Sequence, residues 1–414
     1  MFFWTFPRLC VEFVHDRKTE KSMALKRSIT FDILEGAQEF LTVGLLGSRQ
    51  SGKTTLSQLI FKDHAYVSLE DIEMRTAATI EPRTFLNANR NASGLIIDNF
   101  HYVPELLSYM QPKGGSHTPG TYIVCGPYNS STLEFLTGYL GETFSLSILE
   151  SLSLHELTDN YLLPHALDVV LYRGLQPAVY MNDGDTKSHY KNFLSTYIDK
   201  DVRFYGQVDN VTTFHTFLTH CAQYNGHVLN ITTLANESGI SDHTARRWIS
   251  LLEDHHILFL LKPYHTDFGK RLIKSPKLYF YDPGVVCSLL KIEEHELPKY
   301  RNKQGLFESL IIGELMKWTR QRKQKRPQLY FWRDKTEHEI DCLIEHDGKV
   351  IPVSLRGDQK TDAFSHDLKY WQKVSGLRDR GICISSSLGP PEEKEDHLDI
   401  GWRFMQPLFK SIQS

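Results

Sequence analysis

Apolar and polar positions alternate along the first third of the chain in a pattern that predicts a parallel α/β sheet. Four short apolar runs, each long enough for one buried strand, are separated by stretches with helical spacing. The predicted strands lie at residues 42–46, 66–69, 94–97 and 121–125. Short apolar strands that alternate with helices are typical of a parallel sheet covered by helices on both faces.

The pattern changes after residue 150. Residues 150–208 predict connecting helices, of which 193–203 is the most clearly amphipathic. Between 211 and 262, two or three short helices end in an apolar run, and a basic loop and a strand at 277–281 follow. This order is typical of a winged helix-turn-helix with the loop as its wing.

Within that region, the helix that begins after Ser241 carries a clear division between an apolar and a polar face. Ser241 is the expected N-cap. The side chains on the apolar face are Ala245, Trp248, Ile249 and Leu252, and those expected to point outward are His243, Arg246, Arg247 and Ser250.

From about residue 306 the pattern is α/β again. A helix at 306–320 and a strand at 329–333 precede two alternating runs joined by Asp347-Gly348, a strong signal for a two-residue hairpin turn. With that turn, Asp341 lies opposite Ser354 and Glu339 lies opposite Arg356, all on one face of the hairpin.

Composition and charge fit an ordinary soluble globular protein of several domains. The chain has 414 residues, of which 41% are hydrophobic and 23% charged, and its net charge is −3. A nucleic-acid surface would therefore have to be a local patch. The six cysteines form no CxxC pair and no apolar run is long enough to span a bilayer. Both observations favour a cytoplasmic protein without a zinc ribbon, a disulfide frame or a membrane partner. The histidines also lack the spacing of metal ligands.

The strongest chemical signal is the stretch LTVGLLGSRQSGKTT at 41–55. Gly47, Gly52, Lys53 and Thr54 match the phosphate-loop pattern G-x-x-x-x-G-K-[ST]. Backbone N–H groups of such a loop curl around a phosphate, the lysine reaches the β- and γ-phosphates, and the hydroxyl binds Mg²⁺. We therefore expect ATP and Mg²⁺ as ligands, with Thr54 and Asp98 holding the ion. The predicted nucleotide contacts are Gly47, Ser48, Gln50, Ser51, Gly52, Lys53, Thr54, Thr55 and Asp98.

Several motifs in order resemble one large prokaryotic family. They are GSRQSGKTT, YVSLED, LIIDNFHYVPELL, TARRWISLLE, KSPKLYFYDPG and YFWRDKTEHEID. Members carry an AAA-type ATPase domain followed by a C-terminal domain of unknown function. The resemblance, which covers about residues 24–375, implies a P-loop ATPase core at 23–150 and a winged helix at 209–285. The residue pattern itself predicts a helical connector or lid at 151–208 and, before the core, an N-terminal extension or an early start codon at 1–22. A C-terminal α/β domain at 286–414, similar to restriction endonucleases of the PD-(D/E)XK type, completes the expected architecture.

Departures from the family pattern concern hydrolysis. Asn99 stands where the family has the glutamate that activates water, and an amide cannot accept the proton, so we expect slow or absent turnover. Arg203 matches a family arginine that would be a sensor or finger, and an ion pair with Asp199 is the alternative. A competent ATPase that uses another carboxylate also stays open, and the candidates are Glu70, Asp71 and Glu105.

The C-terminal domain departs from active nucleases as well. Ser354 and Arg356 occupy the positions of the metal-binding Glu and the Lys, whereas Asp341 is retained and Glu308 would add a carboxylate. We expect an inert domain with a Glu339–Arg356 ion pair and without nuclease activity.

Two basic regions leave a DNA-binding regulator or defence protein as a third hypothesis. The candidate DNA contacts are Arg246, Arg247, Lys270, Arg271 and Lys274, with Lys277 beside the wing. Packing between domains is the alternative use of this module. A second cluster, which includes Lys317, Arg320 and Arg326, is interpreted as a solvated helix end. The oligomeric state does not follow from the sequence.

Overall fold

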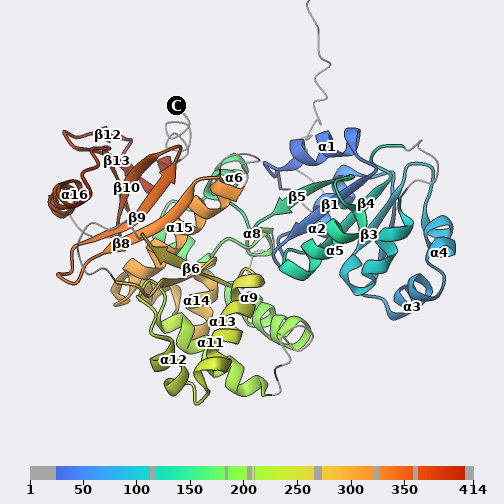
Figure 1. Cartoon of the computed structure of the whole chain (residues 1–414), viewed down its shortest axis with the longest axis horizontal. Coiled ribbons are helices and arrows are strands. Elements are labelled where there is room, and N and C mark those ends of the chain that lie inside the picture. The colour runs from blue at the N-terminus through green and yellow to red at the C-terminus, as the bar shows by residue number, and fades with distance from the viewer. Residues whose placement is uncertain are drawn as a thin grey trace, which may run out of the picture.

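The protein is described by a computed structural model that covers residues 25–111, 118–181, 185–202, 208, 210–264, 273–320, 326–357 and 362–405. Two sheets form separate halves, joined by the helices that follow the first sheet (Figure 1). The predicted extension at 1–22 lies outside the described residues. Within those residues, no helix combines the length and apolarity of a bilayer-spanning segment.

The first sheet has five parallel strands in the order β2-β3-β4-β1-β5. The strands are β1 (Thr42–Gly47), β2 (Ala65–Ser68), β3 (Leu95–Asp98), β4 (Tyr122–Pro127) and β5 (Phe144–Leu149). The first four confirm the predicted strands to within two residues at either end. The edge strand β5 was not predicted, because its alternating serines and partly exposed positions make a weak apolar run.

Helices cover both faces of this sheet, as predicted. They are α1 (Thr30–Glu39), α2 (Lys53–Ile60), α3 (Ile72–Ile80), α4 (Pro82–Asn89) and α5 (Ser130–Leu140), with short 3₁₀ turns at Phe100–Tyr102 and Pro104–Tyr109. Ile33 of α1 and Leu56 of α2 pack with Val43 on one face. On the other face, Phe85 of α4 and Leu136 of α5 pack in the same cluster as the strand residues of β3 and β4.

The connecting segment after β5 is helical. It contains α6 (Leu154–Asp159), α7 (Leu167–Arg173), α8 (Pro177–Met181) and α9 (Thr186–Thr196), followed by a π-helical turn at Tyr197–Val202. The single helix predicted at 193–203 is therefore divided between the end of α9 and this turn. Arg203 lies outside the described residues.

Three helices and a hairpin follow: α11 (Val211–Gln223), α12 (Ile231–Glu237), α13 (Asp242–Asp254), β6 (Leu258–Pro263) and β7 (Lys277–Phe280). Ser241 caps α13 through the N–H of Thr244, and the four predicted apolar side chains are buried. Arg246 and Arg247 are exposed, as predicted, whereas Lys270 and Arg271 lie outside the described residues. The winged-helix assignment itself stays a prediction.

The second sheet has eight strands in the order β12-β13-β11-β10-β9-β8-β6-β7. Its further strands are β8 (Gln328–Arg333), β9 (Glu339–His346), β10 (Lys349–Arg356), β11 (Gly381–Ser385), β12 (Glu392–Glu393) and β13 (His397–Gly401), and its helices are α14 (Pro283–Leu290), α15 (Lys303–Arg320) and α16 (Asp362–Ser375). Strand β6 pairs with both β7 and β8, so the hairpin of the central region belongs to this sheet. One hydrophobic core extends from Leu152 to Met405.

The predicted β9–β10 hairpin is confirmed in type and register. Asp347 and Gly348 both have positive φ, 48° and 80°, as a two-residue turn of type I′ requires. His346 pairs with Lys349, and the pairing continues to Cys342 with Val353. The Ser354 hydroxyl then donates to Asp341 Oδ2 at 3.1 Å, as that register demands.

Candidate functional site: a phosphate loop at the edge of the first sheet

The order of the strands brings the predicted site together. The phosphate loop follows β1, and Asp98 ends β3, with β4 lying between these two strands. Because the strands are parallel, their carboxyl ends meet at one edge of the sheet. Asp98 is aligned with Cys125, and Gly47 is aligned with Pro127.

Backbone constraints explain the glycines of the loop. A Cβ on Gly47 would lie 2.1 Å from the carbonyl oxygen of Leu149, so no other residue fits there without movement of β5. Gly52 has φ of 95°, a left-handed conformation that glycine adopts without steric cost. Helix α2 begins at the next residue, and the N–H groups of its first turn are those that an α-helix leaves for an anion.

Lys53 and Thr54 lie where phosphate and Mg²⁺ chemistry would need them. The Lys53 ammonium donates to two carbonyls of its own loop, Gly47 at 3.1 Å and Ser48 at 2.8 Å. The Thr54 hydroxyl donates to Asp98 Oδ2 at 2.5 Å, and the Tyr66 hydroxyl donates to the same oxygen at 3.2 Å. Burial, followed by the Asp98 charge, raises the pKa of Tyr66 to about 12, so this phenol stays a donor at neutral pH.

A cavity of about 710 Å³ opens over this edge, a volume within the ~300–1,000 Å³ range of small-molecule sites. The predicted residues that line it are Gln50, Ser51, Gly52, Lys53, Thr54, Thr55, Asp98 and Asn99. Gly47 and Ser48 instead border a small pocket behind the loop. Leu25 and Leu59, with Pro177 and Met181 of α8, contribute apolar walls that sequence reasoning did not identify.

Asn99 faces the cavity in a left-handed conformation, with φ of 59°, and its N–H donates to Asp98 Oδ1 at 3.0 Å. Asparagine is among the few residues other than glycine enriched in this conformation. Of the alternative bases, Glu70 lines the cavity. Asp71 is engaged as the N-cap of α3, and Glu105 is exposed in the 3₁₀ turn at Pro104–Tyr109. Among these three carboxylates, Glu70 has the most suitable position.

His101 is a cavity residue that the sequence analysis missed. It lies on the turn after Asp98, 9% exposed. Burial, together with the positive charges of Lys53, Arg75 and Arg49, lowers its pKa from about 6.5 to about 3. The imidazole is therefore neutral at physiological pH, in a cationic environment suited to an anionic ligand.

The lowered pKa of His101 predicts acid sensitivity. Between pH 6.5 and 3 the unfolded chain binds a proton that the folded site resists, so this residue reduces stability as pH falls through that window. We expect the free energy of unfolding to decline less steeply from pH 6.5 to 4 in His101→Gln than in the wild type. Urea titrations at several pH values measure the slopes, with the exposed His243→Gln as control. An unchanged slope in His101→Gln would contradict the prediction.

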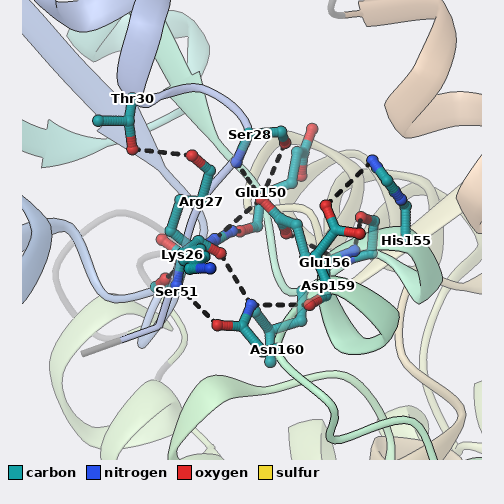
Figure 2. A network of polar contacts seen from close by, with 12 residues as sticks. Lys26, Arg27, Ser28, Thr30, Ser51, Glu150, His155, Glu156, Asp159 and Asn160 are labelled. Atoms are coloured by element: carbon teal, nitrogen blue, oxygen red, sulfur yellow. Dashed lines mark hydrogen bonds and ion pairs between the residues drawn. The ribbon is translucent and has the colours of Figure 1, made fainter. Parts of the chain in front are cut away.

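A largely buried arginine, Arg27, lines the same cavity and supports the phosphate loop. Arg27 is 8% exposed and donates from Nη1 to the Ser51 carbonyl at 2.7 Å, from Nη2 to the Glu150 carbonyl at 2.6 Å, and from Nε to Glu156 Oε1 at 3.1 Å (Figure 2). Burial opposes the Glu156 charge, but Arg27 and two backbone N–H groups outweigh it and lower the pKa of that carboxyl. No local motif marks Arg27, because its partners are 24 to 129 positions away.

Helix α15 contacts the connection between β5 and α6, which contains Glu150 and Leu152. Arg320 Nη1 lies 2.7 Å from Glu150 Oε1, and Lys317 Nζ donates to the Leu152 carbonyl at 2.8 Å and to Glu314 at 2.9 Å. Lys317 is 3% exposed, so the interpretation of these two residues as a solvated helix end was wrong. Arg326, in contrast, is exposed.

A second charged cluster lies between β7, α15 and β9. Lys277, expected beside the wing, is 4% exposed; its ammonium contacts Glu339 and lies 3.6 Å from Glu308. Burial opposes its charge, but Glu308, Glu339 and Asp341 outweigh burial and raise the pKa of Lys277. The Tyr279 hydroxyl and Gln304 donate to Glu308 at 2.7 and 3.0 Å.

The expected Glu339–Arg356 ion pair was wrong, although the two strands have the predicted register. Glu339 binds Lys277 and lies 3.3 Å from Arg333, whereas Arg356 lies 3.4 Å from Asp341 and 3.9 Å from Asp367. The buried ammonium of Lys277 attracts Glu339 away from the neighbouring strand. The Lys277 ammonium lies between Glu308 of α15 and Glu339 of β9, where a divalent cation would need these carboxylates as ligands.

Tertiary structure also brings together His338, His366 and Asp367, the group that could hold a metal among the described residues. Asp367 Oδ1 lies 3.3 Å from His338 Nδ1 and 3.9 Å from His366 Nδ1. The guanidinium of Arg356 is 3.9 Å from the other oxygen of Asp367, and this permanent charge opposes a divalent cation. We assign no metal to this group.

Comparisons with known proteins divide the chain into three parts. Residues 39–158 match the model of an AAA domain, residues 165–296 a domain of unknown function (DUF8612), and residues 303–400 a second domain of unknown function (DUF4143). Uncharacterized proteins of Mycobacterium bovis and Mycobacterium tuberculosis are each 27% identical over 319 residues, which is 75% of this chain and 69% of theirs.

Two solved structures show more distant similarity. The Walker-type ATPase of Pyrococcus abyssi is 12% identical, with a TM-score of 0.43, over 67% of this chain and 99% of its own. A signal-transduction ATPase (STAND) protein with a tetratricopeptide repeat sensor from Pyrococcus horikoshii is 10% identical, with a TM-score of 0.25, over 73% of this chain and 46% of its own. The family matches carry the assignment: this chain contains an AAA-type P-loop ATPase domain and, C-terminal to it, a DUF4143 domain.

Proposed function

We propose that the protein binds ATP–Mg²⁺ at the phosphate loop, hydrolyses it slowly or not at all, and uses nucleotide occupancy to set the arrangement of its C-terminal part. The observation that carries the proposal is the complete binding half of the site, Lys53 and Thr54 with Asp98 at one cavity, beside Asn99 in place of a carboxylate. The five described cysteines are buried and free, which supports a reducing compartment such as the cytoplasm.

Support for nucleotide control comes from the connection between β5 and α6. Arg27 ties its Glu150 carbonyl to the loop, and Arg320 of α15 binds the Glu150 side chain. The Leu154 N–H donates to Glu314 of the same helix at 2.8 Å. Behind the loop, His256 Nδ1 lies 3.2 Å from the carbonyl of Tyr128, which follows β4. If nucleotide binding moves the loop, it would therefore disturb these contacts with α15 and with His256, which lies two residues after the end of α13.

Replacing Asn99 tests the hydrolysis part of the proposal. Asn99→Asp introduces a carboxylate in a residue type that also tolerates the left-handed conformation, and Asn99→Glu restores the family's side chain at some conformational cost. General-base help is worth roughly 10²–10⁴ in rate, so phosphate release should rise clearly in at least one variant. Glu70→Gln should leave the slow wild-type rate unchanged.

A brisk wild-type rate that Asn99→Glu leaves unchanged would contradict slow hydrolysis. Loss of that rate in Glu70→Gln would instead support the alternative of an active ATPase, because Glu70 is the candidate base that lines the cavity.

DNA binding by a winged helix is the second candidate, favoured by the exposed Arg246, Arg247 and Lys274. Lys277 is withdrawn from this surface, because it is buried. The nuclease-like character of the C-terminal domain also stays a proposal. Lys277 between Glu308 and Glu339, with Arg356 beside Asp341, supports an inactive centre.

A further inference from the structure

We propose that Arg27 is a positioning residue of the phosphate loop: it fixes the orientation of the Ser51–Gly52 peptide so that the loop is preorganised for phosphate. This inference rests on the proposed nucleotide function and adds to it the residue that holds the binding conformation. Arg27 precedes α1 and lies outside the phosphate-loop motif, and its side chain reaches the loop from the side of the connection between β5 and α6 (Figure 2).

The geometry of one peptide carries the argument. In a trans peptide the C=O and the following N–H point in opposite directions. The Ser51 carbonyl accepts from Arg27 Nη1 at 2.7 Å, so the Gly52 N–H points away from the guanidinium. Gly52 lines the cavity together with Lys53 and Thr54, the first residues of α2. Arg27 lines this cavity as well, so its bond holds the Ser51 carbonyl toward the guanidinium and turns the Gly52 N–H to the opposite side of the peptide, the side that we assign to the anion.

Without that bond, the peptide has no comparable constraint. Gly52 adopts a left-handed φ and carries no side chain, so rotation of the Ser51–Gly52 peptide meets little steric resistance. The nearest atom to a Cβ built on Gly52 is Arg27 Nη1, at 3.9 Å. A rotated peptide would direct a carbonyl oxygen toward the phosphates, which would oppose binding.

Arg27 is itself held rigidly. Its other two contacts go to the Glu150 carbonyl and to Glu156. Glu156 Oε1 also accepts from the N–H and the hydroxyl of Ser28, both at 2.9 Å, and Oε2 accepts from the Ser153 N–H at 3.1 Å. A planar guanidinium with donors in a fixed fork can satisfy three such acceptors at once, whereas a lysine ammonium carries a point charge without that geometry.

The same region offers a matched control. Asn160 joins the two segments that Arg27 joins: its Oδ1 accepts from the Lys26 N–H at 2.8 Å and its Nδ2 donates to the Lys26 carbonyl at 3.0 Å. It therefore ties the N-terminal segment to α6 in the same way, but its side-chain hydrogen bonds within the described part of the chain go to Lys26 and Glu156 and not to Ser51. Asn160→Ala removes a neighbouring tie and leaves the loop peptide anchored.

The experiment measures binding of Mg²⁺–ATP and Mg²⁺–ADP to the full chain by calorimetry. Arg27→Lys and Arg27→Ala should weaken both nucleotides by about tenfold or more, whereas Asn160→Ala should bind as the wild type does. Circular dichroism spectra and thermal melts identify folded variants, and Arg27→Lys serves if Arg27→Ala does not fold. Phosphate-loop N–H groups contact phosphates that both nucleotides carry, so the loss should be similar for ATP and ADP.

The outcomes separate the two ideas. If the folded wild type binds neither nucleotide, the proposed function fails. If the wild type binds and folded Arg27→Lys binds equally well, the function stands and the positioning role is overturned. Equal weakening in Arg27→Lys and Asn160→Ala would also overturn it, because a general loss of packing between the N-terminal segment and α6 would then explain both.

Discussion

Replacing Lys53 with alanine should weaken binding of Mg²⁺–ATP by roughly 100-fold or more, equivalent to about 2.7 kcal/mol. The Lys53 ammonium lies over the loop, where it donates to the Gly47 and Ser48 carbonyls. On ATP binding it would exchange these neutral acceptors for charged phosphate oxygens, and hydrogen bonds to charged groups are the stronger class. Its removal also deprives the γ-phosphate of the lysine's positive charge, so ATP should lose more affinity than ADP.

Calorimetric titration of ATP and ADP into wild type and Lys53→Ala measures the effect. Lys62→Ala is the matched control, because Lys62 is exposed just beyond the end of α2 and changes the net charge equally. Equal ATP affinity of wild type and Lys53→Ala would show that the loop is not the binding site. Equal losses in Lys53→Ala and Lys62→Ala would indicate that only the overall charge matters.

Features with a local signature were predictable from the sequence. The phosphate loop, Asp98 at the end of β3 and the Asp347-Gly348 turn each follow from a short motif, and the structure brings the first two together at one cavity. Strand β5 was missed, because its serines and its edge position give no continuous apolar run. The helix predicted at 193–203 was only partly right, because amphipathic spacing does not distinguish an α-helix from one that ends in a π-helical turn.

Features that depend on distant contacts were not predictable in this way. Arg27 and His101 carry no motif of their own, and their roles follow from partners that the sheet and the β5–α6 connection bring near. Lys277 and Lys317 were interpreted as surface cations because lysine is rarely buried. Lys277 is buried instead beside carboxylates of other elements, and Lys317 beside a carboxylate of its own helix. A lysine that is paired in this way is the exception to that rule.

The charged cluster around Lys277 predicts the largest loss of stability for a single substitution. Lys277→Met keeps the length and apolar stem of the side chain but removes the ammonium. Glu308, which is buried, and Glu339, at the side of the cluster, would then lose the cation that both contact. Because breaking a buried ion pair leaves an uncompensated charge, we expect a loss of about 3–5 kcal/mol in the free energy of unfolding.

Urea denaturation and calorimetry of the full chain measure this loss, with Lys274→Met as the control. Lys274 is exposed three residues before Lys277, so its substitution should change the unfolding free energy by no more than about 0.5 kcal/mol.

The double variant Lys277→Met/Glu308→Gln should recover part of the stability, because it removes one of the carboxylates left without a cation. If Lys277→Met costs no more than Lys274→Met, the buried ammonium does not hold α15 and β9 together, and the argument that it takes the place of a metal ion loses its basis. If the double variant is less stable than Lys277→Met, Glu308 is stabilised mainly by Tyr279 and Gln304, whose bonds to it do not require Lys277.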